Sequence, residues 1–251
     1  MAHRIPSAPN EMASQPLLGA VRSTNTRTGL RPLQREVSMT ANSMFPNSQL
    51  YETGYCVIFA RGINPAEILA RVSGQKVFQF HLNRIEAEAI KALGEDIEEE
   101  DVPDLNLEEL YESGILNNSG PLLRAGTYND WSFAIESEGP YLADDRLLRT
   151  ASQNTEAISA RVSETGSKWI SYAERGEILS SFDPLFPHHD YGSRPSILEG
   201  LTNYQEAISR GNRADSFENA FREIQHALNC AVPKEADALR LLTVRVAGAY
   251  S

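Results

Sequence analysis

Apolar and polar residues alternate along much of the chain after residue 54, and their spacing predicts several strands. Tyr55–Ala60 is a continuous apolar run, which is typical of a central strand buried on both faces. Trp131–Glu136 alternates large apolar residues with smaller or polar ones, which indicates a strand with one buried face. The other expected strands are Lys76–Leu82, Pro121–Arg124, Thr155–Ser163, Lys168–Ala173 and Ile178–Phe182.

Helices are expected where apolar residues recur at intervals of three and four. A short helix should begin after Asn64, because Asn is a good N-cap, Pro65 suits the first helical position and Glu67 completes a capping pattern. A last helix should open at Pro233 and include Leu239 and Leu242. The remaining expected helices are Ile85–Leu93, Asp144–Thr150, Ser196–Ser209 and one that runs from Asp215 to Ala231.

These elements predict one α+β domain over residues 51–251, with a mainly antiparallel sheet of five or six strands packed against helices. The last three helices should form one layer. Residues 1–50 are rich in Ser, Pro, Asn, Thr and Arg and lack apolar periodicity, so we expect a disordered N-terminal tail. Met39 and Met44 leave open whether residues 1–43 belong to the native protein.

Charge is distributed unevenly: the net charge is −11, although residues 1–50 carry five Arg and only two acids. Residues 51–251 therefore carry the excess of acids, and a region this acidic is a poor binder of nucleic acids. No apolar run approaches the roughly 18 residues that a membrane helix requires. We therefore expect a soluble, cytoplasmic protein that binds neither nucleic acid nor membrane.

Residues 95–112, called the acidic segment below, contain ten acids and no base. The segment is predicted to be a solvated, mobile insert within the domain. Two interpretations remain open: a charged linker, or a surface that mimics phosphates and faces a basic partner. Under the second interpretation its densest run would contact that partner, namely Glu98, Glu99, Glu100 and Asp101.

The best candidate for chemistry lies in residues 183–190, called the Asp/His loop below. Phe182, Leu185 and Phe186 are expected to anchor this loop in the core, with Pro184 and Pro187 stiffening it. Its polar residues form a candidate binding loop: Asp183, His188, His189 and Asp190.

Imidazole and carboxylate groups suit a metal ion or acid–base catalysis. Neighbouring residues on an extended chain point to opposite sides, however, so His188 and His189 cannot easily share one ion. Cys56 and Cys230 have no zinc-site spacing and are expected to be buried. We therefore assign no metal, cofactor or catalytic residue, and the favoured role of the loop's polar groups is to hold the turn.

Several stretches resemble one uncharacterised domain family that is common in actinobacterial genomes. The residues that carry the resemblance are Gly54–Gly62, Pro65–Glu67, Trp131–Glu136, Gly139, Tyr172–Ala173, Phe182–Pro187 and Leu241–Val246. The long N-terminal tail and the acidic segment depart from the family pattern. The resemblance implies a domain, and it implies no reaction and no catalytic residues.

Three functions are compatible with the sequence. The favoured hypothesis is a non-enzymatic protein-interaction domain, immunity-like or regulatory, whose partner is another protein with a basic surface. The alternative is a small hydrolase or metal-dependent enzyme centred on the Asp/His loop, and a weaker third is a structural subunit of a larger assembly. The identity of the partner or substrate and the oligomeric state are not encoded in any motif of the chain.

Overall fold

The computed structural model describes residues 54–74, 80–116 and 120–247. The predicted tail at residues 1–50 therefore lies outside the described residues. An eight-stranded antiparallel sheet forms the centre of the described part, in the order β2-β8-β3-β4-β1-β5-β6-β7. The strands are β1 (Tyr55–Arg61), β2 (Phe80–Leu82), β3 (Leu122–Tyr128), β4 (Trp131–Ser137), β5 (Glu156–Val162), β6 (Lys168–Glu174), β7 (Glu177–Phe182) and β8 (Leu241–Arg245).

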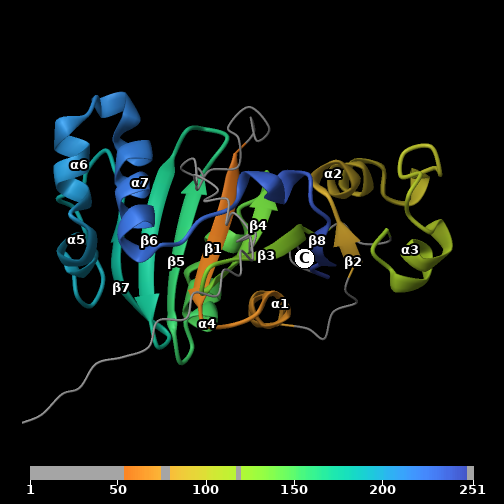
Figure 1. The fold of residues 1–251 in the computed structure, drawn as a ribbon, viewed down its shortest axis with the longest axis horizontal. Coiled ribbons are helices and arrows are strands. Elements are labelled where there is room, and N and C mark those ends of the chain that lie inside the picture. The colour runs from red at the N-terminus through yellow and green to blue at the C-terminus, as the bar shows by residue number, and fades with distance from the viewer. Residues whose placement is uncertain (1–53, 75–79, 117–119, 248–251) are drawn as a thin grey trace, which may run out of the picture. The chain divides into compact units, whose positions relative to one another are not determined.

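Helices cover both faces of this sheet (Figure 1). This arrangement confirms the predicted α+β class, and the strand pairing confirms the predicted antiparallel character of the sheet. The α-helices are α1 (Pro65–Ser73), α2 (Arg84–Leu93), α3 (Leu107–Ser113), α4 (Asp145–Ala151), α5 (Ile197–Thr202), α6 (Tyr204–Arg210) and α7 (Ser216–Leu228). The short 3-10 helices are η2 (Gly94–Asp96), η3 (Tyr141–Ala143), η4 (Arg213–Asp215) and η5 (Lys234–Asp237). Among the described residues, no helix has both the length and the apolar character needed to cross a membrane.

Strand β1 shows how the layers arise from the sequence. Because side chains alternate along a strand, Val57 and Phe59 face one side, where they pack in a cluster with residues of α5, α6 and α7. Cys56 and Ile58 face the opposite side, where they pack with residues of α1 and α4. Both faces are covered, which explains why the sequence of β1 is apolar throughout.

A third apolar cluster lies around α2 and α3, at the β2 end of the sheet. Helix α2 lies over β3 and β4, where its residues Ala87 and Lys91 line a small cavity with Leu122 and Ile135. The start of α2 is fixed by a capping box: Asn83 accepts a hydrogen bond from the amide of Glu86, and the Glu86 carboxylate accepts one from the amide of Asn83.

The predicted strand count of five or six is wrong, because the sheet has eight. The expected last helix is also wrong. The region after Pro233 forms only the short helix η5, and Leu241–Arg245 then adds strand β8 between β2 and β3. Leu239 and Leu242 have helical spacing, but the backbone of β8 pairs with β3, whose residues are more than 100 positions earlier in the chain.

Candidate functional site

The Asp/His loop is a structural connection in which carboxylates bind backbone and hydroxyl groups. Asp190 accepts hydrogen bonds from the Ser180 hydroxyl at 2.8 Å and the Ser181 amide at 3.0 Å. It also accepts one from the Ser196 amide at 2.8 Å. Asp183 accepts a hydrogen bond from the Leu185 amide at 2.8 Å, which is an Asx turn. Both carboxylates of the candidate site therefore hold the chain in place.

The histidines of this loop are not assembled into a site. His188 and His189 are both exposed, and the His189 ring stacks against Phe186 at 6.1 Å between ring centroids. Among the described residues, no group of three or more His, Cys, Asp or Glu side chains is placed to hold a metal ion.

Only one of the three expected apolar anchors of the loop is buried. Phe182 is fully buried and stacks on Tyr204 at 4.1 Å between ring centroids. Leu185 is 42% exposed and Phe186 is 51% exposed, so the expectation that they anchor the loop is wrong. The loop is held at its ends by Phe182 and Asp190 and also by a hydrogen bond from the Gln205 side chain to the Pro187 carbonyl at 3.1 Å, while Leu185, Phe186 and both histidines are exposed.

The two cysteines are buried, as the sequence predicted. Cys56 and Cys230 are both buried and free. Burial raises the pKa of the Cys230 thiol to about 12, and burial together with nearby Glu136 raises the pKa of the Cys56 thiol well above its usual value. Both thiols are therefore protonated at neutral pH, and the thiolate is the reactive form.

The acidic segment contributes buried residues to the cluster around α2, so the expectation of a wholly solvated insert is wrong. Ile97, Val102 and Leu110 are each at most 3% exposed and pack in the cluster around α2. Asn106 caps α3 by accepting hydrogen bonds from the amides of Glu108 and Glu109. Acidic side chains in a first helical turn are also favoured by the helix dipole.

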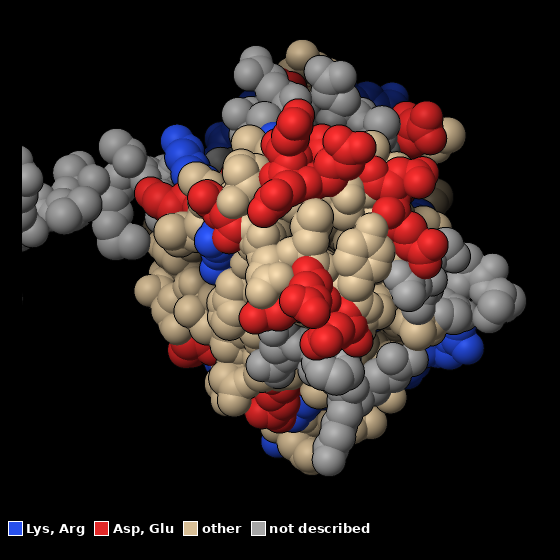
Figure 2. Space-filling view, turned by 90° about the vertical axis from the view of Figure 1, so that its right-hand side faces the viewer, with Lys and Arg blue, Asp and Glu red and all other residues tan. Residues whose placement is uncertain are grey.

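All ten carboxylates of the acidic segment are exposed, as predicted. Figure 2 shows carboxylates gathered on this side of the molecule, around uncharged surface. Tyr111, in α3, is 44% exposed, and its hydroxyl donates to the Glu95 carbonyl at 2.8 Å. Within the described part of the chain, Asp104 is the one carboxylate of the ten that pairs with a base, Arg240, at 3.4 Å. We call this surface the acidic face.

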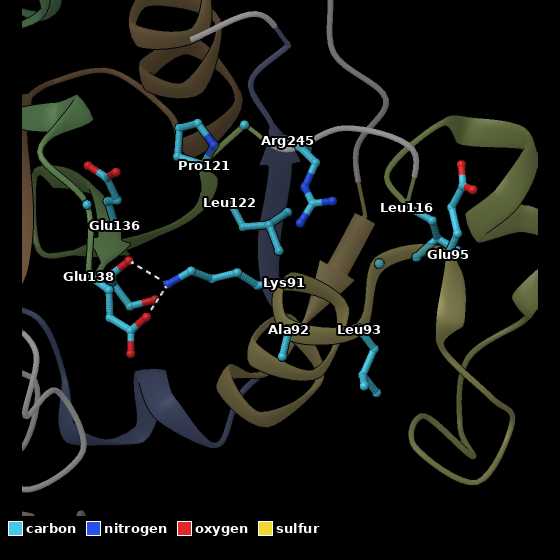
Figure 3. A pocket seen from close by; sticks show the side chains of 14 residues that line it. Lys91, Ala92, Leu93, Glu95, Leu116, Pro121, Leu122, Glu136, Glu138 and Arg245 are labelled. Carbon is cyan, nitrogen blue, oxygen red and sulfur yellow. Dashed lines mark hydrogen bonds and ion pairs between the residues drawn. The ribbon is translucent and has the colours of Figure 1, made fainter. Parts of the chain in front are cut away.

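A cleft of about 500 Å³ opens beside the acidic segment, and no motif in the sequence indicated it. Its walls come from the end of α2, the start of β3, the end of β4 and the end of β8 (Figure 3). The apolar residues that line it are Ala92, Leu93, Leu116, Pro121 and Leu122. Its charged residues are Lys91, Glu95, Glu136, Glu138 and Arg245. We call it the Arg245 cleft.

Two of the charged groups in this cleft have well-defined partners. Lys91 donates to the carboxylate of Glu138 at 2.6 Å and to the carbonyl of Ser137 at 3.2 Å. Glu136 is 1% exposed, and its carboxylate accepts hydrogen bonds from the amides of Tyr141 and Leu142 in η3. Gly139 is required beside it, because a Cβ at that position would lie 1.6 Å from the Glu136 carboxylate oxygen.

Arg245 differs from these groups. It is half-buried, and its Nε atom has no hydrogen-bond partner in the described structure. Burial lowers the pKa of its guanidinium, although an arginine remains protonated at neutral pH. Sequence analysis missed Arg245 because residues 241–245 were expected to be partly helical, and because the cleft forms only when four distant segments meet.

The comparisons with known proteins identify a family. Residues 43–223 match the model of the family described as "Family of unknown function (DUF6461)". The matched range covers most of the sheet, the acidic segment and the Asp/His loop, and it ends before β8. Neither curated proteins nor solved structures gave a match to the chain.

Proposed function

This chain belongs to the DUF6461 family of unknown function, and we propose that it is a protein-binding domain, immunity-like or regulatory, that recognises a basic surface on its partner. The observation that carries the proposal is the acidic face. It holds ten exposed carboxylates on a folded frame, and in the described structure one of them is paired with a base. A charged linker would not need an apolar core beneath it.

Electrostatics define what such a surface does. Clustered charges of one sign raise the rate at which an oppositely charged partner meets the surface, and salt weakens this effect. Fixed carboxylates are more selective than those on a mobile chain, because their relative positions are set before binding. Tyr111 supplies an exposed aromatic ring within the same segment, and tyrosine is a frequent anchor in protein interfaces.

The enzymatic alternative stays a prediction, and the geometry does not favour it. The carboxylates of Asp183 and Asp190 bind neighbouring amides and a hydroxyl, and His188 and His189 are exposed at the loop tip. A general acid or base must reach its substrate within a shaped site. The Asp/His loop presents an exposed tip and offers no such site in the described structure.

Testing the proposal requires a candidate partner protein. In the actinobacterial genomes where we expect relatives of this chain, the product of a neighbouring gene with a basic surface is the first partner to purify. The association rate should be measured at low and at high salt for the wild type and for a variant in which Glu98, Glu99, Glu100 and Asp101 are all Ser. We expect this variant to associate at least tenfold more slowly at low salt, and to differ little at high salt.

A matched control removes the same total charge elsewhere. In the control variant, four exposed acids outside the segment become Ser: Asp145, Glu164, Glu177 and Asp215. The control should retain most of the wild-type rate if location matters. Equal rates for the two variants would show that net charge alone drives the encounter, and an unchanged rate for both would remove the acidic face from the functional account.

A further inference from the structure

We propose that the Arg245 cleft binds a small organic monoanion, with a carboxylate seated on the Arg245 guanidinium and an apolar body against the leucine and proline walls. This site borders the acidic face, with which it shares Glu95, and the proposal does not depend on protein binding. A cleft volume of about 500 Å³ lies within the usual range for small-molecule sites. Figure 3 shows the arrangement: dashed lines leave Lys91, and none reaches Arg245.

A neighbouring arginine, Arg124, shows how Arg245 differs from a guanidinium that the fold satisfies completely. Arg124 on strand β3 is 5% exposed, and its guanidinium donates to the carbonyls of Leu82, Ala236 and Leu239. Arg124 shows that backbone carbonyls can satisfy a buried guanidinium on this sheet, although Arg161 on β5, like Arg245, has an Nε without a hydrogen-bond partner in the described structure. Arg245 lies on the adjacent strand, and its inaccessible Nε has no such acceptor in the described structure.

The partly buried charge of Arg245 makes an anion favourable in this cleft. A guanidinium that has lost part of its hydration is stabilised by an anion that restores the lost hydrogen bonds. Lys91 does not compete for that anion, because Glu138 already neutralises it. Of the two cationic residues that line the cleft, Lys91 is paired with Glu138, whereas Arg245 has no ion-pair partner among the described residues.

The surrounding charges select a monoanion over a dianion. Glu95 is exposed at the cleft and makes no ion pair with a described residue, and the other lining acids, Glu136 and Glu138, are already engaged. A doubly charged phosphate would be repelled by these carboxylates and could be balanced by only one free cation. A carboxylate carries one charge and matches the planar fork of arginine with two parallel hydrogen bonds.

The walls define the rest of the ligand. Leu93 is 38% exposed at the end of α2, and Leu116 and Leu122 line the interior. Leu93 gains most by contact with an apolar group, because Leu116 and Leu122 are already only 3% and 7% exposed, and none of the three side chains offers a hydrogen bond to a second polar group. The chemistry that fits is a short aliphatic or aryl-alkyl carboxylate.

The test uses the full-length protein and defined probes. Hexanoate and 4-phenylbutanoate are titrated by calorimetry and by NMR, alongside the matching uncharged amides and inorganic phosphate. We expect at least one carboxylate to bind with a Kd on the order of 1 mM or tighter. Its amide should bind at least tenfold more weakly, and phosphate should not bind at the same site. No binding by either carboxylate, or equal binding of acid and amide, would overturn the proposal.

Variants separate the role of Arg245 from its effect on folding. Arg245→Met keeps an unbranched apolar stem without the guanidinium and should weaken carboxylate binding at least tenfold, whereas Arg245→Lys should retain only part of the affinity because the fork is lost. Arg222→Met, at an exposed arginine of α7, is the matched control and should bind like the wild type. Wild-type affinity in Arg245→Met would refute the site.

A second variant tests the cleft without touching Arg245. Glu95→Gln changes an exposed residue, so the fold is not at risk, and it removes the negative charge that a carboxylate approaches. We expect tighter carboxylate binding in this variant, with a difference that shrinks as salt is raised. Equal or weaker binding in Glu95→Gln would show that Glu95 does not repel the bound carboxylate, and the proposed position of the anion in this cleft would then fail.

Discussion

The Asp/His loop and the acidic segment both mix apolar and acidic residues, but their apolar side chains are packed in opposite ways. Residues 183–190 hold two aromatic or aliphatic side chains that the structure leaves at the surface, Leu185 and Phe186. Residues 95–112 hold apolar side chains scattered among ten acids. Three of the apolar side chains, Ile97, Val102 and Leu110, are almost completely buried. The number of apolar residues therefore does not decide whether a segment is packed. What decides it is whether another element presents an apolar surface for them to cover.

The acidic segment has such a surface beneath it. The inner side of α2 contributes Ala87 and Ile90, and the sheet contributes Leu82 and Leu122. Covering these residues removes apolar area from water, while the acids remain hydrated on the outside. The tip of the Asp/His loop has no comparable covering in the described structure, so Phe186 contacts His189 and the guanidinium of Arg213 instead.

The largest expected effect contrasts two phenylalanines of the loop region. Phe182→Ala removes a fully buried ring that stacks on Tyr204, and it should lower the free energy of unfolding by about 4 kcal/mol. Phe186→Ala removes a ring that is 51% exposed, and it should cost less than about 1 kcal/mol. Urea denaturation of both variants measures the difference, and similar costs would show that the loop tip is anchored after all.

The second effect concerns the core of the acidic segment. Leu110→Ala truncates a side chain that is 1% exposed and should cost roughly 3 kcal/mol in the free energy of unfolding. Glu112→Ala, at an exposed position in the same helix, is the control and should stay within about 0.5 kcal/mol of the wild type. A Leu110→Ala variant as stable as its parent would restore the interpretation of a solvated linker.

The sequence predicts those features of the fold that depend on residues close together in the chain. The hairpin of β6 and β7 was readable, since the predicted strands Lys168–Ala173 and Ile178–Phe182 are separated by a few residues, and Arg175 and Gly176 make the turn between them with positive φ. The cap at Asn64 was readable too, and its side chain accepts a hydrogen bond from the Glu67 amide at 2.9 Å. These features depend on residues a few positions apart.

The features that were missed depend on residues far apart in the chain. Strand β8 exists because residue 241 onward pairs with β3 and β2, and its local leucine spacing favoured a helix. The Arg245 cleft requires β8 to lie beside the end of α2, which no local pattern encodes. The core of the acidic segment had a local signal, Leu107 and Leu110 after a capping Asn106, but ten acids in the same stretch concealed it.

A third prediction separates a structural carboxylate from a catalytic one. Asp190→Ala leaves the amides of Ser181 and Ser196 and the Ser180 hydroxyl without their acceptor, and should cost about 2 kcal/mol in the free energy of unfolding. His188→Ala should be neutral, because His188 is exposed. Hydrogen exchange at the Ser181 amide should accelerate in the Asp190 variant. Unchanged stability and exchange would show that Asp190 is not needed to hold the loop, and would support the enzymatic alternative, which is centred on this loop.

The smallest effect on stability is expected from the acids themselves. Replacing Glu98, Glu99, Glu100 and Asp101 by Ser should change the free energy of unfolding by less than about 0.5 kcal/mol, because all four side chains are exposed. The turn around them survives such a change: Asp101 accepts a hydrogen bond from the Glu98 amide at 3.0 Å, and a serine hydroxyl can also accept one.

The sign of this small change depends on salt. Removing like charges relieves repulsion, so the variant should gain stability relative to the wild type at low ionic strength, and the gain should fade near 0.15 M salt, where the Debye length is about 8 Å. Thermal denaturation across a salt series measures this dependence. A loss of several degrees at every salt concentration would mean that these acids hold the segment together, and the separation between an apolar frame and a functional charged surface would no longer stand.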